Sequence, residues 1–243
     1  MHETLAQYSA LMVMEDEFGS AGIRRVLARE HGLYLRGRAG ERGVEPSLAR
    51  VERQSYVHYH KGALAMYALR DAMGEDRLNQ SLSRFLARAS AAQPPYTTTA
   101  ELLDELRPAL PQTSKHLVED LFEQITMYDV AVVAATASER PDGTFLLRVE
   151  LGARKLRGDG AGAEREIPMD ESVDIVVHGE QASGASHTTE LLLERRLIST
   201  TRSSFDLVLA ERPVRVEIDP YFKLIDRDRD DNVRIVVPAQ DPR

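Results

Sequence analysis

The spacing of apolar residues changes at Tyr128, and this change limits the folds open to the chain more than any other feature. Before Tyr128, apolar residues recur every three or four positions, as they do along one face of a helix. After Tyr128 they follow a period of two in short runs rich in Val, Ile and Leu, as in strands. The sequence therefore predicts an α+β protein of two domains, with a helical domain over 1–128 and a β-sandwich over 129–243.

Glycines and a capping motif set the expected ends of the helices. We expect Gly19 and Gly74 to end helices, while Thr98 and Glu101 have the spacing of a capping box. The Gly- and Arg-rich stretch 32–46 is expected to be a solvated loop. The helices are expected over 3–18, 21–31, 51–73, 75–89, 98–106 and 113–126.

The second half contains short strands separated by turn signals. The turn Pro141-Asp142-Gly143 predicts a hairpin, because proline presets one dihedral angle and glycine permits another. The run 156–166 is expected to be a mobile loop because it is rich in small residues. The strands are expected over 130–136, 144–151, 172–178, 190–197, 204–209, 214–219 and 233–237.

The run Asp226–Asn232 has the alternating acidic residues of a calcium-binding loop. However, Asp231 occupies the position where an EF-hand needs glycine, Val237 stands where it needs glutamate, and two arginines in the run oppose a cation. We therefore interpret this run as a solvated turn between strands.

Composition excludes several classes of function. The net charge is −8 and neither half of the chain is basic, which argues against binding to nucleic acid or to an anionic membrane surface. The chain has no cysteine, so it can form neither a disulfide nor a thiolate metal site. No apolar run approaches the roughly 20 residues that a membrane helix needs, so the chain itself is expected to be soluble. The sequence does not indicate the compartment, because a protein without cysteine suits reducing and oxidising surroundings alike.

Two short motifs point to a function. The chain opens with Glu3-Thr4-Leu5-Ala6-Gln7-Tyr8, and Tyr59-His60-Lys61-Gly62-Ala63 follows at a spacing of 56 residues from Glu3 to Tyr59. Together they resemble the zinc aminopeptidases of the gluzincin type, the alanyl and leucyl aminopeptidase family. The resemblance continues through Tyr34–Arg38, Gln93–Tyr96 and Ile218–Tyr221. It is strongest to bacterial peptidase modules fused behind transporter-like membrane segments.

The resemblance implies a role for one residue of each motif. It makes Glu3 the third zinc ligand and Tyr59 the residue that stabilises the oxyanion. It also implies that residues 1–128 are the helical C-terminal part of a thermolysin-like catalytic domain, acting on peptides from which N-terminal residues are removed. Without the resemblance, Glu3 is an ordinary first-turn carboxylate, and Tyr59 is most simply a core tyrosine.

The sequence lacks the H-E-x-x-H motif, which in this family supplies two histidine ligands and the general base. The start of the chain, His2–Ala6, lacks the second histidine, and His116–Asp120 lacks the closing histidine of the inverted motif. His58 and His60 do not replace them, because residues two apart on a helix point about 200° away from one another.

We therefore expect a fragment of a longer zinc aminopeptidase. The fragment alone is expected to be inactive and to hold no cofactor tightly, with zinc bound in the parent protein. We expect the parent to be associated with a bacterial membrane, and the exposed cleft face at Glu3 and Tyr59 to favour self-association of the fragment. The alternative is a non-catalytic interaction or scaffold module of a membrane transporter assembly.

Overall fold

The computed structural model describes residues 1–91, 93, 94, 96–180 and 189–239, so Pro95 of the Gln93–Tyr96 motif lies outside the described residues. The chain divides into two units. The helical unit comprises Met1–Thr126 and Arg157–Arg165, and the strand unit comprises Met127–Leu156 and Glu166–Arg243. The protein is therefore a mixed α+β protein with two β-sheets. None of the described helices combines the length and apolar character that crossing a membrane requires.

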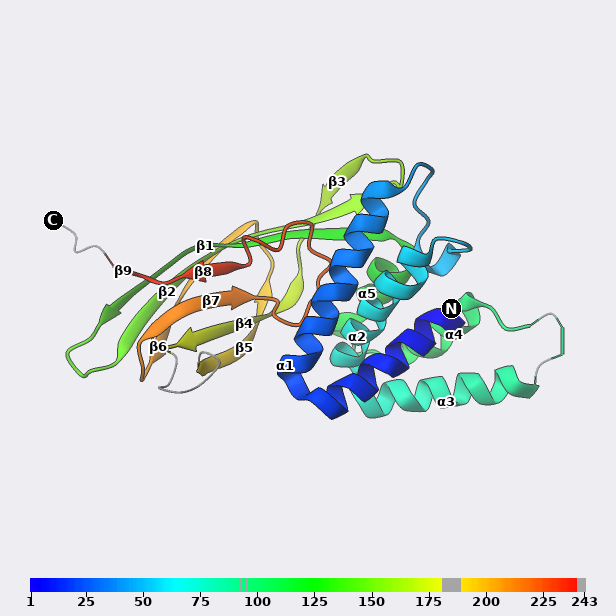
Figure 1. Cartoon of the computed structure of the whole chain (residues 1–243), viewed down its shortest axis with the longest axis horizontal. Coiled ribbons are helices and arrows are strands. Elements are labelled where there is room, and N and C mark those ends of the chain that lie inside the picture. Colours follow the sequence, from blue (N-terminus) through cyan, green and yellow to red (C-terminus); the bar gives the residue numbers. More distant parts are fainter. Residues whose placement is uncertain (92, 95, 181–188, 240–243) are drawn as a thin grey trace. The chain divides into compact units, whose positions relative to one another are not determined.

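The first helix, α1 (His2–Gly40), bends at Gly19 (Figure 1). Gly19 has φ 64° and ψ −172°, a backbone conformation that is essentially restricted to glycine. The expected break at Gly19 is therefore a kink between two helical arms. The expectation that the second arm ends at His31 is wrong, because helical structure continues to Gly40 and buries Tyr34.

The other helical segments of the helical unit are short. Gly74 ends α2 with φ 87°, and Thr98 forms the expected capping box with Glu101. The helix predicted over 51–73 begins only near Tyr56. The helix predicted over 113–126 ends at Glu123, and strand β1 has already begun at Ile125. The segments are η1 (Leu48–Arg50), η2 (Tyr56–Lys61), α2 (Gly62–Met73), α3 (Glu75–Ala91), α4 (Thr99–Leu106), η3 (Arg107–Ala109), η4 (Gln112–Ser114), α5 (His116–Val118) and η5 (Glu119–Glu123).

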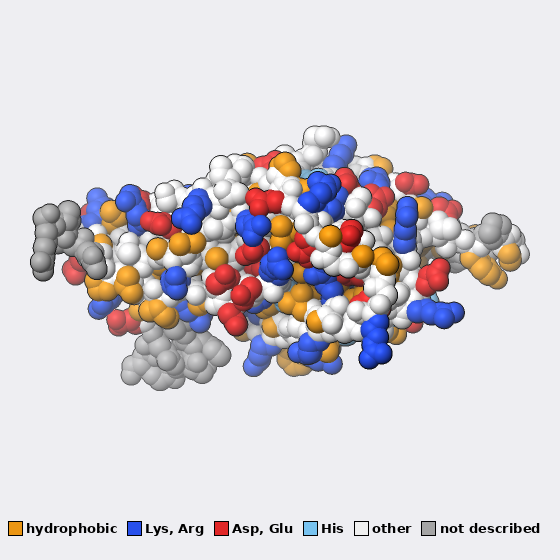
Figure 2. All heavy atoms as spheres, turned by 90° about the horizontal axis from the view of Figure 1, so that it is seen from above, with side chains coloured by type: hydrophobic (Ala, Val, Ile, Leu, Met, Phe, Trp, Pro, Cys, Tyr) orange, Lys and Arg blue, Asp and Glu red, His pale blue; other side chains and the backbone are white. Residues whose placement is uncertain are grey.

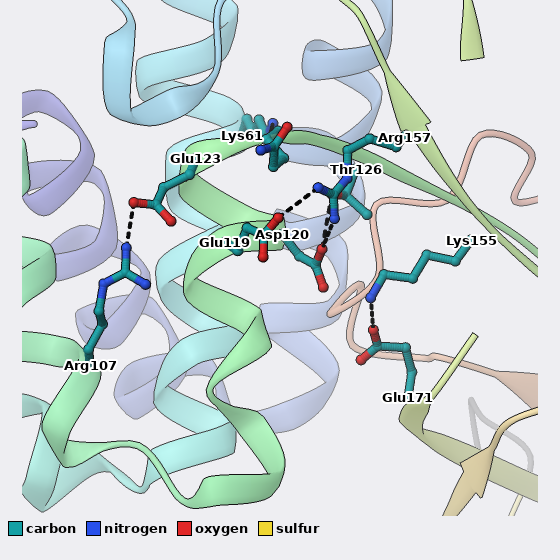
Figure 3. A network of polar contacts seen from close by, with 10 residues as sticks. Lys61, Arg107, Glu119, Asp120, Glu123, Thr126, Lys155, Arg157 and Glu171 are labelled. Carbon is teal, nitrogen blue, oxygen red and sulfur yellow. Dashed lines mark hydrogen bonds and ion pairs between the residues drawn. The ribbon is translucent and has the colours of Figure 1, made fainter. Parts of the chain in front are cut away.

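The stretch 156–166 is not the mobile loop that the sequence predicted. Its first residues continue a strand, and its last residues begin another. Arg157 fixes it within the helical unit by donating hydrogen bonds to Glu119 Oε1 at 3.0 Å and to Asp120 Oδ1 at 2.6 Å (Figure 3). Charge-assisted hydrogen bonds of this kind are strong, so they hold the segment in place.

The strands form two sheets. In the first sheet the order is β3-β2-β1-β9, and β6 also pairs with β2; in the second it is β5-β4-β7-β8. The short strand β3 was not predicted. The strands are β1 (Ile125–Glu139), β2 (Phe145–Gly158), β3 (Glu164–Ile167), β4 (Glu171–Gly179), β5 (Glu190–Ile198), β6 (Arg202–Leu209), β7 (Pro213–Ile218), β8 (Val233–Ile235) and β9 (Val237–Pro238).

Buried residues of both sheets form one hydrophobic core. Alternate residues of β2, such as Leu147 and Val149, point into it, and so do Val173 and Ile175 of β4. This alternation is the period of two seen in the sequence. The predicted Pro141–Gly143 turn joins β1 to β2, with Gly143 at φ 81°.

The run Asp226–Asn232 is not simply a solvated turn. Asp226 and Asn232 are both fully buried, while Asp228 and Asp230 between them are exposed. The acidic run therefore has two ends anchored inside the strand unit.

Basic and acidic side chains are mixed on one face of the molecule. On the face drawn in Figure 2, Lys and Arg side chains are interspersed with Asp and Glu side chains, without a broad patch of either sign. This face has no concentration of positive charge of the kind that attracts polyanions.

Replacing Gly19 with alanine tests the kink in α1. No atom lies within 4 Å of the position where a Cβ would be, so only the backbone conformation opposes the change. We expect Gly19→Ala to lower the free energy of unfolding by about 1 to 3 kcal/mol in urea denaturation. The matched control is Gly40→Ala, where the space is equally open and φ is not positive. Equal stability of the two variants would contradict the kink.

Candidate functional site

Tyr59 lies in η2, a π-helical turn at the centre of the helical unit. In this turn the backbone N–H of Gly62 reaches the carbonyl of Val57, five residues earlier. Such turns are rare and are frequently found at functional sites, because the extra residue changes the direction of the neighbouring side chains. The Tyr59–Ala63 motif therefore spans the change from π-helix to the regular helix α2.

The structure brings Glu3 and Tyr59 together. The Tyr59 hydroxyl and the Glu3 carboxylate lie close enough to interact, although 56 residues separate them in the chain. The interaction lowers the pKa of Glu3 and raises the pKa of the Tyr59 phenol. Glu3 is therefore an anion and Tyr59 a neutral donor at neutral pH. The Glu3 side chain remains about one-third exposed.

A close contact between two elements produces this pairing. The hydroxyl of Thr4, next to Glu3 in the first turn of α1, donates a hydrogen bond to the carbonyl of His58 at 2.7 Å. Gly62 permits the approach, because a Cβ at this position would lie 2.6 Å from Thr4 Oγ1. The first turn of α1 is thus seated on η2, and Glu3 and Tyr59 meet beside that contact.

His58 and His60, on either side of Tyr59, make different contacts. His60 Nδ1 lies 2.6 Å from Glu30 Oε2, and the Glu30 side chain is fully buried. The His58 ring meets the Tyr59 ring edge to face, with centroids 4.7 Å apart. Glu30 comes from the second arm of α1, so both arms of this helix hold the turn that carries Tyr59.

Lys61 is fully buried beneath the turn. Its Nζ donates a hydrogen bond to the carbonyl of Gln124 at 3.2 Å and lies over the ring of Tyr34. Burial lowers the pKa of Lys61 from 10.5 to about 8. Lys61 therefore anchors the motif to the end of the helical unit and is not available to a substrate.

The immediate surroundings of Glu3 supply one metal ligand and no complete metal site. Among the described residues, Glu3 belongs to no group of three His, Asp or Glu side chains with ligand atoms within 4.8 Å of one another. A zinc ion held by Glu3 would need further ligands, because catalytic zinc has three protein ligands.

Sequence reasoning identified Glu3 and Tyr59 as candidates but missed Thr4 and Glu30. Thr4 lies within the first motif, so its proximity to Glu3 was a usable signal. Glu30 lies in no motif, and only the path of α1 brings it to His60.

Replacing Gly62 with alanine tests the seating of α1 on η2. We expect Gly62→Ala to lower the free energy of unfolding by about 1 to 3 kcal/mol, since the new Cβ would overlap Thr4. Thr4→Ala in the same chain removes the two nearest atoms and should restore much of the loss, with a coupling energy of about 0.5 to 3 kcal/mol. The control is Gly32→Ala, where the nearest atom is 3.6 Å away. Additive effects of the Gly62 and Thr4 changes would contradict the close contact.

The pH dependence of stability tests the burial of Lys61. The folded chain releases the Lys61 proton near pH 8, whereas the unfolded chain keeps it up to about pH 10.5. Stability contributed through Lys61 therefore rises with pH across this window. Relative to Lys61→Met, wild type should gain about 1 kcal/mol per pH unit in urea denaturation between about pH 8 and 10. Lys115→Met, at an exposed lysine, should show no such trend. Parallel profiles for wild type and Lys61→Met would contradict the burial.

No protein-family model matches the chain, and no curated protein matches it either. A functional assignment therefore depends on the two motifs and on the contact between Glu3 and Tyr59.

Proposed function

We propose that this chain belongs to a zinc-dependent aminopeptidase of the gluzincin type, with Glu3 as a zinc ligand and Tyr59 as the hydrogen-bond donor to the oxyanion. The observation that carries the proposal is that the structure brings these two side chains into interaction with each other. If Tyr59 were only a core residue and Glu3 only a surface residue, nothing would require their side chains to lie close together. In an aminopeptidase both must face the same scissile carbonyl.

The properties of Glu3 fit a metal ligand. Its carboxylate is ionised and partly exposed, so an oxygen is open to an ion from outside the helix. Bound zinc would polarise the scissile carbonyl and a water molecule. Zinc accepts a carboxylate oxygen beside imidazole nitrogens, and a set of two histidines and one glutamate is a known catalytic donor set.

Tyr59 has the protonation state that an oxyanion donor needs. The neighbouring carboxylate raises the pKa of Tyr59 above its usual value of 10, so the hydroxyl keeps its proton at neutral pH. A neutral hydroxyl donates a hydrogen bond to the negative charge that develops on the carbonyl oxygen. Thr4, Glu30 and His60 hold the turn in place. The hydroxyl has a single proton, so it would exchange its interaction with Glu3 for a hydrogen bond to the oxyanion when substrate binds.

The rest of the catalytic apparatus would come from residues outside this sequence. The chain contains no H-E-x-x-H, so two histidine ligands and the general base must be supplied by other parts of a longer protein. In that protein the helical unit would be the C-terminal part of a thermolysin-like domain, and the strand unit would be a β-sandwich. We expect the 243-residue chain alone to hydrolyse no alanyl or leucyl anilide.

Replacing Tyr59 with phenylalanine in the complete enzyme tests the proposal. The change removes only the hydroxyl and keeps the ring, so zinc content and thermal stability should stay close to wild type. Losing one oxyanion donor lowers kcat by on the order of 100- to 1000-fold. The measurements are kcat and KM for an aminoacyl anilide, together with zinc content by metal analysis.

Tyr67→Phe is the matched control. Its hydroxyl bonds Glu15 at 2.8 Å, within the same unit and outside the motif, so its loss should leave kcat nearly unchanged. Wild-type turnover in the Tyr59 variant would refute the role of Tyr59. A complete protein that lacks both H-E-x-x-H and peptidase activity would favour the scaffold alternative.

A further inference from the structure

The loop 219–232, which joins β7 to β8, fastens two strands of the strand unit to each other. On one side Tyr128 of β1 exchanges backbone hydrogen bonds with it, donating to Ile225 and accepting from Arg227, each at 2.9 Å. On the other side Ile218 of β7 donates to the carbonyl of Asn232 at 2.9 Å. We call residues 219–232 the clasp, because β1 and β7 belong to different sheets.

The first buried carboxylate of the clasp, Asp219, is paired with a cation, although burial still raises its pKa to about 6. It is 1% exposed and accepts hydrogen bonds from the backbone N–H groups of Lys223 at 2.9 Å and Leu224 at 3.1 Å. Arg229 Nη1 donates to Asp219 Oδ2 at 3.0 Å, and its Nη2 donates to the Asp219 carbonyl at 2.8 Å. The guanidinium also lies over the ring of Phe222. The positive charge of Arg229 is therefore committed to Asp219.

The second buried carboxylate, Asp226, has no such compensation. Asp226 is 0% exposed, and its Oδ1 accepts the backbone N–H of Asp228 at 3.2 Å. Its Oδ2 is buried without a donor among the described residues, and so is Oδ1 of Asn232, whose side chain also contacts Asp226. Two buried acceptor atoms thus share one corner of the clasp.

The charged groups on the neighbouring elements are paired with one another. Lys155 of β2 donates to Glu171 of β4 at 2.5 Å, and the Tyr128 hydroxyl donates to the same carboxylate at 3.0 Å. Lys223 forms an ion pair with Asp174 of β4. Asp231 lies near three other acidic groups, Asp129, Asp228 and Asp230. Arg227 of the clasp is exposed and has an interaction of its own. Among the described residues, no side chain donates a hydrogen bond to Asp226 Oδ2.

We propose that Asp226 is a buried proton-binding group, protonated on Oδ2 in the folded chain, and that loss of this proton loosens the clasp. A buried carboxylate without a partner is costly in its charged form, and a proton removes the charge. In agreement with this, burial raises the pKa of Asp226 to about 7. The proton also turns Oδ2 into a hydrogen-bond donor beside the unsatisfied Asn232.

A bound metal ion would account for the unsatisfied oxygens of Asp226 and Asn232 less well than a proton does. Calcium takes about six to eight oxygen ligands. Asp228 Oδ1 already accepts the backbone N–H of Asp230 at 3.0 Å. Among the described residues, no three carboxylates of the clasp place oxygens within 4.8 Å of one another.

The sign of the pH effect follows from the two pKa values. The unfolded chain loses the Asp226 proton near pH 4, whereas the folded chain keeps it to about pH 7. Between these values the folded state binds one more proton, so stability falls as pH rises and then levels off above about pH 7. Each pH unit in this window should change the folding equilibrium constant up to about tenfold through this group.

The first experiment compares wild type with Asp226→Asn in urea denaturation from about pH 4.5 to about pH 8. Asparagine has nearly the same shape and no charge, so the variant should gain stability relative to wild type as pH rises. Asp230→Asn, at an exposed aspartate of the same clasp, is the control and should run parallel to wild type. Parallel profiles for wild type and Asp226→Asn would overturn the proposal.

The second experiment needs no variant. Hydrogen exchange of the backbone N–H groups of Ile218 and Arg227, corrected for the intrinsic rate, should lose protection as pH rises toward about 8. The N–H groups of Ile175 and Val177 in β4 should lose less. Equal losses would overturn the proposal. If millimolar calcium chloride restores protection at about pH 8, the clasp is a cation site and the proton assignment is wrong.

Discussion

The seating of the first turn of α1 on η2 is the contact on which the candidate site depends. It exists because Gly62 has no side chain and because the Thr4 hydroxyl satisfies the carbonyl of His58 at 2.7 Å. A glycine at a helix contact permits close approach of a second backbone, at a cost in helix propensity. The contact holds Glu3, at the beginning of α1, close to Tyr59, in the turn before α2.

The buried charged side chains fall into two groups, those with an oppositely charged partner and those without one. Glu30 and Asp120 lie inside the helical unit, and each meets a basic side chain, as does Glu171 in the strand unit. Among the described residues, Lys61 and Asp226 have no oppositely charged partner within bonding distance, and for both of them burial shifts the pKa toward neutrality. Burial also raises the pKa of the paired Asp219, to about 6. Because charge burial is expensive, these three groups make the stability of the chain depend on pH.

The two candidate residues could be named from the sequence, whereas the residues that support them could not. Glu3 and Tyr59 stand in motifs of fixed order, and a motif can be read without knowledge of the fold. Glu30 gave no signal, because its role depends on where the chain returns in space. The arm from Gly32 to Gly40 was misread as a loop, because its glycines and arginines are typical of loops. Burial of Tyr34 and the Arg38–Glu45 ion pair outweighs that local preference.

The sequence by itself determined the helical first half, the strands of the second half, the break in helical backbone at Gly19 and the turn at Gly143, since each follows from a local period or a glycine dihedral. Only the tertiary structure decided that residues 157–165 belong to the helical unit, that Asp226 is buried without a cation, and that Glu3 meets Tyr59. These depend on contacts between residues far apart in the chain. Local spacing carries no information about such distances.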